Sequence, residues 1–142
     1  MRNDFLPAAR LDEQLCFALY SASSRLTSIY RPLLAPLGLT YPQFIVLMAL
    51  WEEDAISISQ LADRAGLSKA TMTPLLKRLE QKGLIQRQLL ADNERQKSVV
   101  LTEAGRTLSL QSSDITERAF CATNLTKQQA HDIMALCQKL VE

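Results

Sequence analysis

Three cysteines, Cys16, Cys121 and Cys137, are the residues of this chain with the clearest capacity for covalent chemistry. A cysteine attacks peroxides as the thiolate, not as the neutral thiol. Residue type alone favours a plainer interpretation, in which each cysteine is a small buried apolar side chain. Cys16 differs in its surroundings, because Tyr20 follows it by four residues and the two side chains would share one helix face. A position near a helix start would also favour a negative charge at Cys16.

Tyr30 lies fourteen residues beyond Cys16, in the same predicted helix. That separation corresponds to about 21 Å along one straight helix. The two side chains therefore cannot meet within one helix, and they can meet only if a second copy of the chain packs antiparallel.

The elements that must position these residues are mostly helical. Apolar residues recur every three or four positions from Leu11 onward, which predicts a helix with Asp12 as its cap. The members of this stripe are Leu11, Leu15, Leu19, Ala22, Leu26, Ile29 and Leu33. Prolines and a glycine at positions 32–38 are expected to end the helix. A second helix is predicted to start at Thr40, where Gln43 completes a capping-box pattern.

The segment from residue 57 to residue 83 predicts a helix-turn-helix. Ser57 and Gln60 form another capping-box pattern, which opens a short helix that Gly66 stops. Ser68 is expected to cap a second helix that runs to about residue 82. Two helices joined by a short glycine-containing turn are typical of the DNA-binding helix-turn-helix.

A β-hairpin is predicted directly after these helices. Residues 84–89 and 97–101 are expected to form two strands, joined by the polar residues 91–95. A helix-turn-helix followed by a hairpin is a winged helix. Thr102 is then expected to cap a fifth helix, which residues 124–126 separate from a last one. We therefore predict a mainly α (α+β) fold built on a winged helix-turn-helix.

Charge is distributed unevenly along the 142 residues, although the net charge is only +1. Residues 60–97 carry 8 basic and 4 acidic side chains, whereas residues 1–59 carry 4 and 6 and residues 98–142 carry 4 and 5. The balance excludes a polybasic tail. The excess of positive charge falls on the predicted winged helix, where binding to DNA phosphates would require it.

The sequence gives no indication of a membrane or metal site. No apolar run approaches the ~18 residues of a membrane span, and the first residues lack the apolar stretch of a signal peptide. We therefore expect a cytoplasmic protein. One histidine and the absence of a Cys-x-x-Cys pair argue against structural zinc, and we expect neither a metal nor a cofactor.

The second helix of the helix-turn-helix is the candidate for base recognition in a major groove. The DNA-binding candidates are Ser68, Lys69, Thr71 and Thr73 for bases, Lys77, Arg78 and Arg87 for phosphates, and Arg95 at the hairpin tip for a minor groove. Pro74 lies inside this helix, where a proline costs about 3 kcal/mol, and we predict a local kink there. A basic face that only meets solvent is the plainer alternative.

The residues that form these elements resemble the MarR family of winged-helix repressors. The stretches of the winged helix that carry the resemblance are residues 61–69 and 79–85. The chain is further similar to the organic-hydroperoxide-sensing branch of that family, the OhrR type, in its two-cysteine subtype. The stretches that carry this narrower resemblance are residues 11–20, 30–34, 39–43 and 71–78.

The resemblance implies an obligate homodimer that binds an inverted repeat in double-stranded DNA. Residues 40–101 would form the winged helix-turn-helix DNA-binding region of a single chain spanning residues 1–142. Residues 1–38 and 102–142 would supply the dimerisation helices. The family function is that of a transcriptional repressor and not of an enzyme.

The resemblance also assigns roles to individual residues. It implies that Cys16 senses organic hydroperoxides and that its oxidation releases the operator. Tyr30 and Tyr41 of the partner chain would hydrogen-bond the thiolate, with Tyr20 beside the site. Cys121 falls where a resolving cysteine is expected. The family pattern departs at the wing, where Asn93 replaces the aspartate that orients an arginine.

Two other functions stay open at this stage. The chain could be a MarR-type repressor that is induced by a small aromatic ligand, with incidental cysteines. It could also be a thiol peroxidase that uses Cys16, although a winged helix is superfluous for catalysis. Cys137 matches no family role, and we interpret it as an apolar side chain of the last helix.

Overall fold

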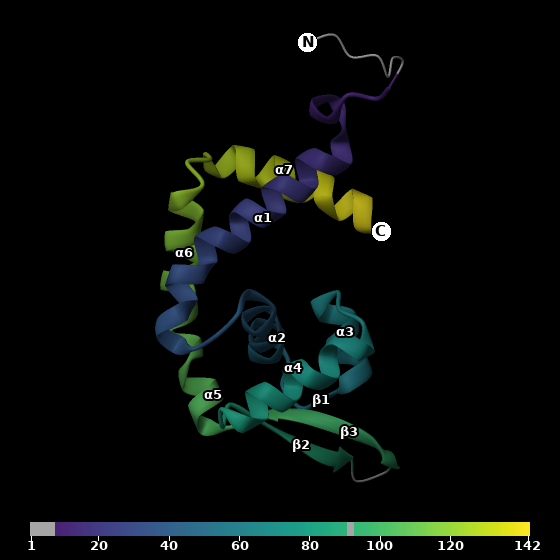
Figure 1. The fold of residues 1–142 in the computed structure, drawn as a ribbon. Coiled ribbons are helices and arrows are strands. Elements are labelled where there is room, and N and C mark those ends of the chain that lie inside the picture. The colour runs from purple at the N-terminus through teal and green to yellow at the C-terminus, as the bar shows by residue number, and fades with distance from the viewer. Residues whose placement is uncertain (1–7, 91–92) are drawn as a thin grey trace.

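The fold consists of a group of terminal helices above a winged helix (Figure 1). The computed structural model describes residues 8–90 and 93–142. The terminal group comprises η1 (Leu11–Glu13), α1 (Leu15–Leu34), α6 (Ser109–Ala122) and α7 (Lys127–Val141). The winged helix comprises α2 (Tyr41–Glu52), β1 (Ile56–Ser57), α3 (Ile58–Ala65), α4 (Lys69–Gln81), β2 (Ile85–Leu90) and β3 (Asn93–Leu101). The connections between the two groups are η2 (Ala35–Leu37) and α5 (Glu103–Thr107).

The caps predicted for the helix-turn-helix are confirmed. Thr40 and Gln43 form a complete capping box at the start of α2, and Ser57 and Gln60 form one at the start of α3. The Ser68 hydroxyl accepts the Thr71 backbone N–H at 3.1 Å and so caps α4. Each of these bonds spans three residues, which explains why the local sequence identifies them.

The three-stranded antiparallel sheet has the order β1-β3-β2. The predicted hairpin is present, but β3 begins at Asn93, so the predicted connection 91–95 is too long. Between β2 and β3 the register changes, from Leu89 opposite Lys97 to Leu90 opposite Asn93. The strand β1 was not predicted, because its two residues carry no periodicity. Its pairing with β3 bridges more than forty residues.

The first helix begins later than predicted. Residues 11–13 form the short η1, Gln14 is extended, and α1 starts at Leu15. Asp12 does not cap the helix, because its carboxylate accepts hydrogen bonds from the Arg10 guanidinium at 3.1 Å. The predicted end is confirmed, since α1 passes through η2 into a left-handed Gly38. Cys16 consequently lies in the first turn of α1.

The hydrophobic core lies in the winged helix, under α2 and α4. Its largest fully buried side chains include Phe44, Leu47, Leu50, Met72 and Leu76. Much of the apolar stripe predicted for the first helix lies outside this core, because Leu11, Leu15 and Leu26 are exposed in the single chain.

In residues 8–90 and 93–142 no single helix is long and apolar enough to cross a membrane. The segments 15–37 and 41–52 meet the length and composition criteria only together, as a pair bent by 74°.

The predicted fifth helix is divided at Leu108 into α5 and α6. Thr102 caps α5 as predicted, by accepting the Gly105 N–H at 3.1 Å. Gly105 is buried directly against the start of the wing, and its carbonyl accepts the Trp51 indole N–H at 2.9 Å. This contact joins α5 to the end of α2.

Gly105→Ala is expected to destabilise the fold by about 3 kcal/mol, the upper range for overpacking. A Cβ at this position would lie 2.1 Å from the Leu84 carbonyl oxygen, which is backbone and cannot rotate away. Urea unfolding at a fixed chain concentration measures the effect. Ala104→Ser on the exposed side of α5 is the control, with a change within about 0.5 kcal/mol. Equal midpoints for the two variants would contradict the prediction.

Candidate functional site

The exposed face of α4 carries the polar residues predicted to read DNA bases. Ser68, Lys69, Thr71 and Thr73 are all exposed. The hydroxyls of Ser68 and Thr71 lie 2.9 Å apart, and the Thr73 hydroxyl donates to the Lys69 carbonyl at 3.1 Å. These bonds hold the first turns in place. The opposite face buries Met72 and its apolar neighbours as predicted, so α4 presents only this polar face to solvent.

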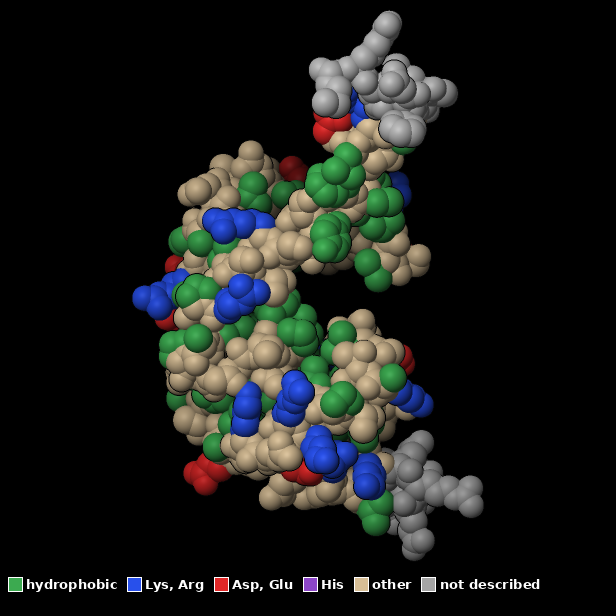
Figure 2. Space-filling view, viewed as in Figure 1, with side chains coloured by type: hydrophobic (Ala, Val, Ile, Leu, Met, Phe, Trp, Pro, Cys, Tyr) green, Lys and Arg blue, Asp and Glu red, His purple; other side chains and the backbone are tan. Residues whose placement is uncertain are grey.

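Basic side chains gather on the surface formed by α4 and the hairpin (Figure 2). Lys77 and Arg78 are exposed beyond the first turns of α4. Arg95 lies in β3 and not in the connection between the strands, so the prediction that it forms the hairpin tip needs correction. The side chains of Asn93 and Arg95 lie outside the described residues. The helix α4 continues through Pro74, and the predicted kink there stays a prediction.

Among the residues that the structure describes, Arg87 is the one predicted phosphate ligand whose charge has an acidic partner. Its guanidinium forms an ion pair with Glu80 at 3.0 Å and joins β2 to the last turns of α4. The hydrogen bond from Arg87 lowers the pKa of Glu80 below its ordinary value. Arg87 therefore holds the wing against α4, and its contact with DNA stays a prediction.

The pair gives a pH-dependent contribution to stability. Because the pKa of Glu80 is lowered in the folded state, the contribution is complete above the pKa of an unfolded glutamate. It is lost as the pH falls through the lower folded value. The stability difference between wild type and Glu80→Gln is expected to be constant from pH 7 down to about pH 5 and to shrink as the pH falls from there to pH 3. Urea unfolding along this range measures it, with the exposed Glu117→Gln as the control. A difference that stays constant between pH 5 and pH 3 would contradict the prediction.

Cys16 is exposed and is the second residue of α1. The side chain of Gln14, the residue before the helix, makes no capping hydrogen bond. The first backbone N–H groups of a helix have no partner within it, and they favour a negative charge nearby. Tyr20, one turn further along, has 71% of its surface exposed. A thiolate at Cys16 would thus be open to reagents and adjacent to an uncovered aromatic ring.

Tyr30 and Tyr41 form a packed pair at the junction of α1 and α2. Their ring centroids are 4.5 Å apart, and Tyr30 also lies 6.0 Å from Phe44. Burial, with a smaller effect of Tyr41, raises the pKa of Tyr30, and burial raises the pKa of Tyr41. Both phenols stay protonated at neutral pH and can donate hydrogen bonds.

Within one chain, the structure does not bring these tyrosines to Cys16. Cys16 lies at one end of the twenty-residue helix α1, and Tyr30 lies in its last turns. Cys121 is exposed in the last turn of α6, and the partly exposed Cys137 lies in α7. All three cysteines are free. In the described part of the chain, no three His, Cys, Asp or Glu residues are placed to hold a metal ion.

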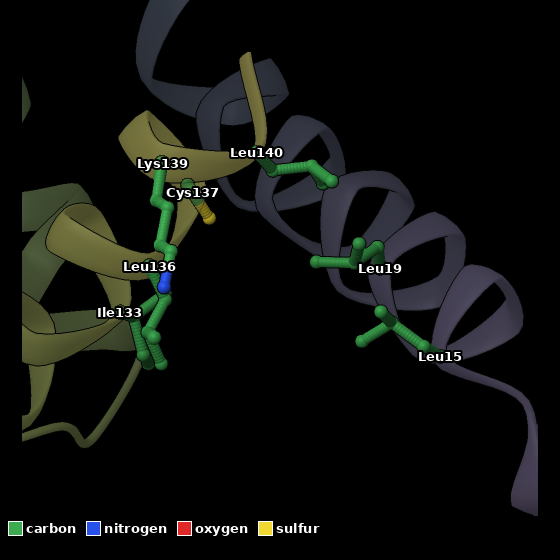
Figure 3. A pocket seen from close by; sticks show the side chains of 7 residues that line it. All are labelled: Leu15, Leu19, Ile133, Leu136, Cys137, Lys139 and Leu140. Carbon is green, nitrogen blue, oxygen red and sulfur yellow. The ribbon is translucent and has the colours of Figure 1, made fainter. Parts of the chain in front are cut away.

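An apolar groove of about 610 Å³ lies between α1 and α7 (Figure 3). The residues that line it are Leu15, Leu19, Ile133, Leu136, Cys137, Lys139 and Leu140. No residue of α7 is buried, although the helix carries a continuous apolar side. Leu15, Leu136 and Leu140 each expose more than 60% of their surface. We call this surface the terminal-helix face.

The capped α4, the hairpin beside it and the basic surface over both define a winged-helix DNA-binding protein. A sequence profile of the MarR family matches residues 39–97. The organic hydroperoxide resistance transcriptional regulator of Bacillus subtilis is 39% identical over 127 residues, covering 89% of this chain and 84% of that protein. The chain belongs to the MarR family. The family and this relative are transcriptional regulators.

Two solved structures extend the comparison. Overoxidized AbfR bound to DNA shares 34% identity with a TM-score of 0.74, covering 92% of this chain and 93% of that chain. BpsR of Bordetella bronchiseptica, whose DNA binding is regulated by 6-hydroxynicotinic acid, shares 25% identity with a TM-score of 0.87, covering 95% of this chain and 98% of that chain. One similar regulator is thus known in an oxidised form, and the other responds to an aromatic acid.

Proposed function

We propose that this chain is a homodimeric transcriptional repressor that releases its operator when an organic hydroperoxide oxidises Cys16. The observation that carries the proposal is the exposed Cys16 in the first turn of α1, on the terminal-helix side of the molecule. This arrangement combines a thiol at a helix start with exposed apolar and aromatic side chains nearby. The 39% identical relative that is named for organic hydroperoxide resistance supports the choice of signal.

The site requires a second copy of the chain for its completion. Cys16 and Tyr30 lie about 21 Å apart along α1, at the rise of a straight helix. An antiparallel partner α1 places the Tyr30–Tyr41 pair of one copy beside Cys16 of the other. The exposed leucines of the terminal-helix face supply the apolar surface that such a dimer buries. The dimer thereby connects the sensing of peroxide to the spacing of two winged helices on an inverted repeat.

The proposed chemistry has two steps. The Cys16 thiolate attacks the terminal oxygen of the hydroperoxide, the O–O bond breaks, and the alcohol leaves after taking a proton. The resulting sulfenic acid then reacts with the Cys121 thiol, which forms an S–S bond and releases water. Tyr30 and Tyr41 of the partner donate hydrogen bonds to the thiolate and to the sulfenate oxygen. The phenols suit this role because both keep their protons at neutral pH.

A non-reducing gel combined with intact mass tests these steps, after one equivalent of cumene hydroperoxide. We expect a covalent dimer in wild type that dithiothreitol reverses, and no such dimer in Cys16→Ser or Cys121→Ser. Cys121→Ser should instead gain one oxygen atom on Cys16. A wild-type Cys16 that is not oxidised at this dose would contradict the proposed function.

The similarity to BpsR favours one second candidate, a repressor induced by a small aromatic acid. Under that alternative the cysteines are incidental, and Cys16→Ser would respond like wild type. The number of peroxide equivalents consumed per chain distinguishes a sensor from a thiol peroxidase, because an enzyme would consume many equivalents with a reductant present. A sensor is oxidised once per site.

A further inference from the structure

Lys82 joins the end of α4 to the start of α2. It is the C-cap residue of α4, and its side chain extends toward the loop that precedes α2. The ammonium donates to the Gly38 carbonyl and, at 3.1 Å, to the side-chain oxygen of Gln43. Although Lys82 itself is exposed, Gln43 is only 3% exposed. One lysine thus holds two points of the η2–α2 connection.

Tyr41 lies between the two points that Lys82 holds. It is the first residue of α2, after Thr40, whose backbone N–H donates to the same Gln43 oxygen at 3.1 Å. The Tyr41 ring packs on Tyr30 at 4.5 Å. A displacement of the tyrosine pair therefore moves the capping box of α2, and it strains or breaks the bonds from Lys82.

The helix α2 cannot absorb such a displacement by bending. Phe44, Leu47 and Leu50 are fully buried along it, and Trp51 fixes its other end to Gly105. Tightly packed elements of this kind move as units. The first turn of α2 also lies alongside the middle of α4, where the two helices line a groove of about 270 Å³.

The other end of the connection is the junction between α4 and the wing. The Lys82 backbone N–H donates to the Arg78 carbonyl at 3.1 Å, and the Leu84 N–H donates to the Leu79 carbonyl at 3.1 Å. Gly83 is left-handed between them, with a φ of 76°, and β2 follows directly. A displacement of Lys82 therefore acts at the junction between α4 and β2, the two elements proposed to contact DNA.

We propose that Lys82 is the positioning residue that couples the Tyr30–Tyr41 pair to the recognition helix and the wing. The proposal rests on the proposed function, because it assumes that oxidation of Cys16 displaces the tyrosines. Lys82 touches neither the peroxide nor the DNA. It links the end of α4 to the start of α2, and it transmits the change when the sensor is oxidised.

The test compares Lys82→Met and Lys82→Arg in the full dimeric protein. The probe is a duplex that the wild-type protein selects from a random-sequence library, and its affinity is measured before and after one equivalent of cumene hydroperoxide. For Lys82→Met we expect an unchanged rate of Cys16 oxidation and an affinity of the reduced form within about threefold of wild type. Oxidation should weaken binding about 10-fold at most, against about 100-fold in wild type. Lys82→Arg should restore most of the response, because its guanidinium can donate to both acceptors.

Lys77→Met is the matched control in the same helix, and it should weaken binding equally in both oxidation states. Release of oxidised Lys82→Met as complete as that of wild type would overturn the proposal. A weaker reduced form with a smaller salt dependence would also overturn it, since Lys82 would then be a phosphate ligand. If Lys82→Met does not fold, Lys82→Gln provides the same comparison. If wild type itself fails to be oxidised or released, the proposed function has failed, which is distinguishable from a failure of the coupling alone.

Discussion

Replacing Cys16 by serine is expected to abolish the release of DNA by organic hydroperoxide and to leave binding by the reduced protein unchanged. Wild type should lose about 100-fold in operator affinity after one equivalent of cumene hydroperoxide, within the usual range of coupling between two sites. The variant should lose none. The physical reason is that a serine hydroxyl is not ionised at neutral pH and cannot take an oxygen atom from a peroxide. Cys16 is exposed, so the substitution removes no core contact.

Fluorescence anisotropy with a labelled operator duplex at fixed salt measures this effect. Cys137→Ser is the control, since Cys137 has no role in the proposed chemistry and should keep the full response. Release of Cys16→Ser by the hydroperoxide would contradict the sensor. Release of both wild type and Cys16→Ser by an aromatic acid such as 6-hydroxynicotinic acid would instead favour the ligand-induced alternative.

A charge placed on the terminal-helix face is expected to have an even larger effect on DNA binding. Leu136 exposes 69% of its surface in the single chain, so Leu136→Glu costs the isolated chain little. In an antiparallel dimer the same carboxylate would be transferred from water into an apolar interface, which is costly for a charge. We expect the variant to be monomeric at micromolar concentration. It should lose about 1,000-fold in affinity for the inverted repeat, because the second half-site no longer adds to the first.

Analytical ultracentrifugation and anisotropy on the same samples measure the two effects together. Gln128→Glu adds the same charge to the first turn of α7, where a helix favours an acidic residue, and it should remain dimeric. A monomeric Leu136→Glu that still binds the inverted repeat with wild-type affinity would separate dimerisation from DNA binding. A dimeric Leu136→Glu would place the interface elsewhere on the molecule.

The sequence alone determined the helix-turn-helix, because its signals are local. The Thr40–Gln43 and Ser57–Gln60 boxes and the Ser68 cap connect residues three apart, and the structure confirms each of them. The apolar face of α4 follows from a periodicity within thirteen residues. The resemblance to the MarR family singled out Cys16, and its distance from Tyr30 followed from the order of residues along one helix.

Only the tertiary structure decided which residues far apart in sequence meet. Asp54 accepts the Leu101 N–H at 2.9 Å, and Lys82 binds Gly38 and Gln43, pairings that no local pattern indicates. The start of α1 was also predicted wrongly, because the Asp12 carboxylate accepts hydrogen bonds from Arg10 and does not cap the helix. Burial separates otherwise similar apolar stripes, since the leucines of α4 enter the core while Leu15 and Leu26 of α1 and the leucines of α7 stay exposed. Periodicity shows that a face is apolar, but only the positions of the other elements show whether the same chain covers it.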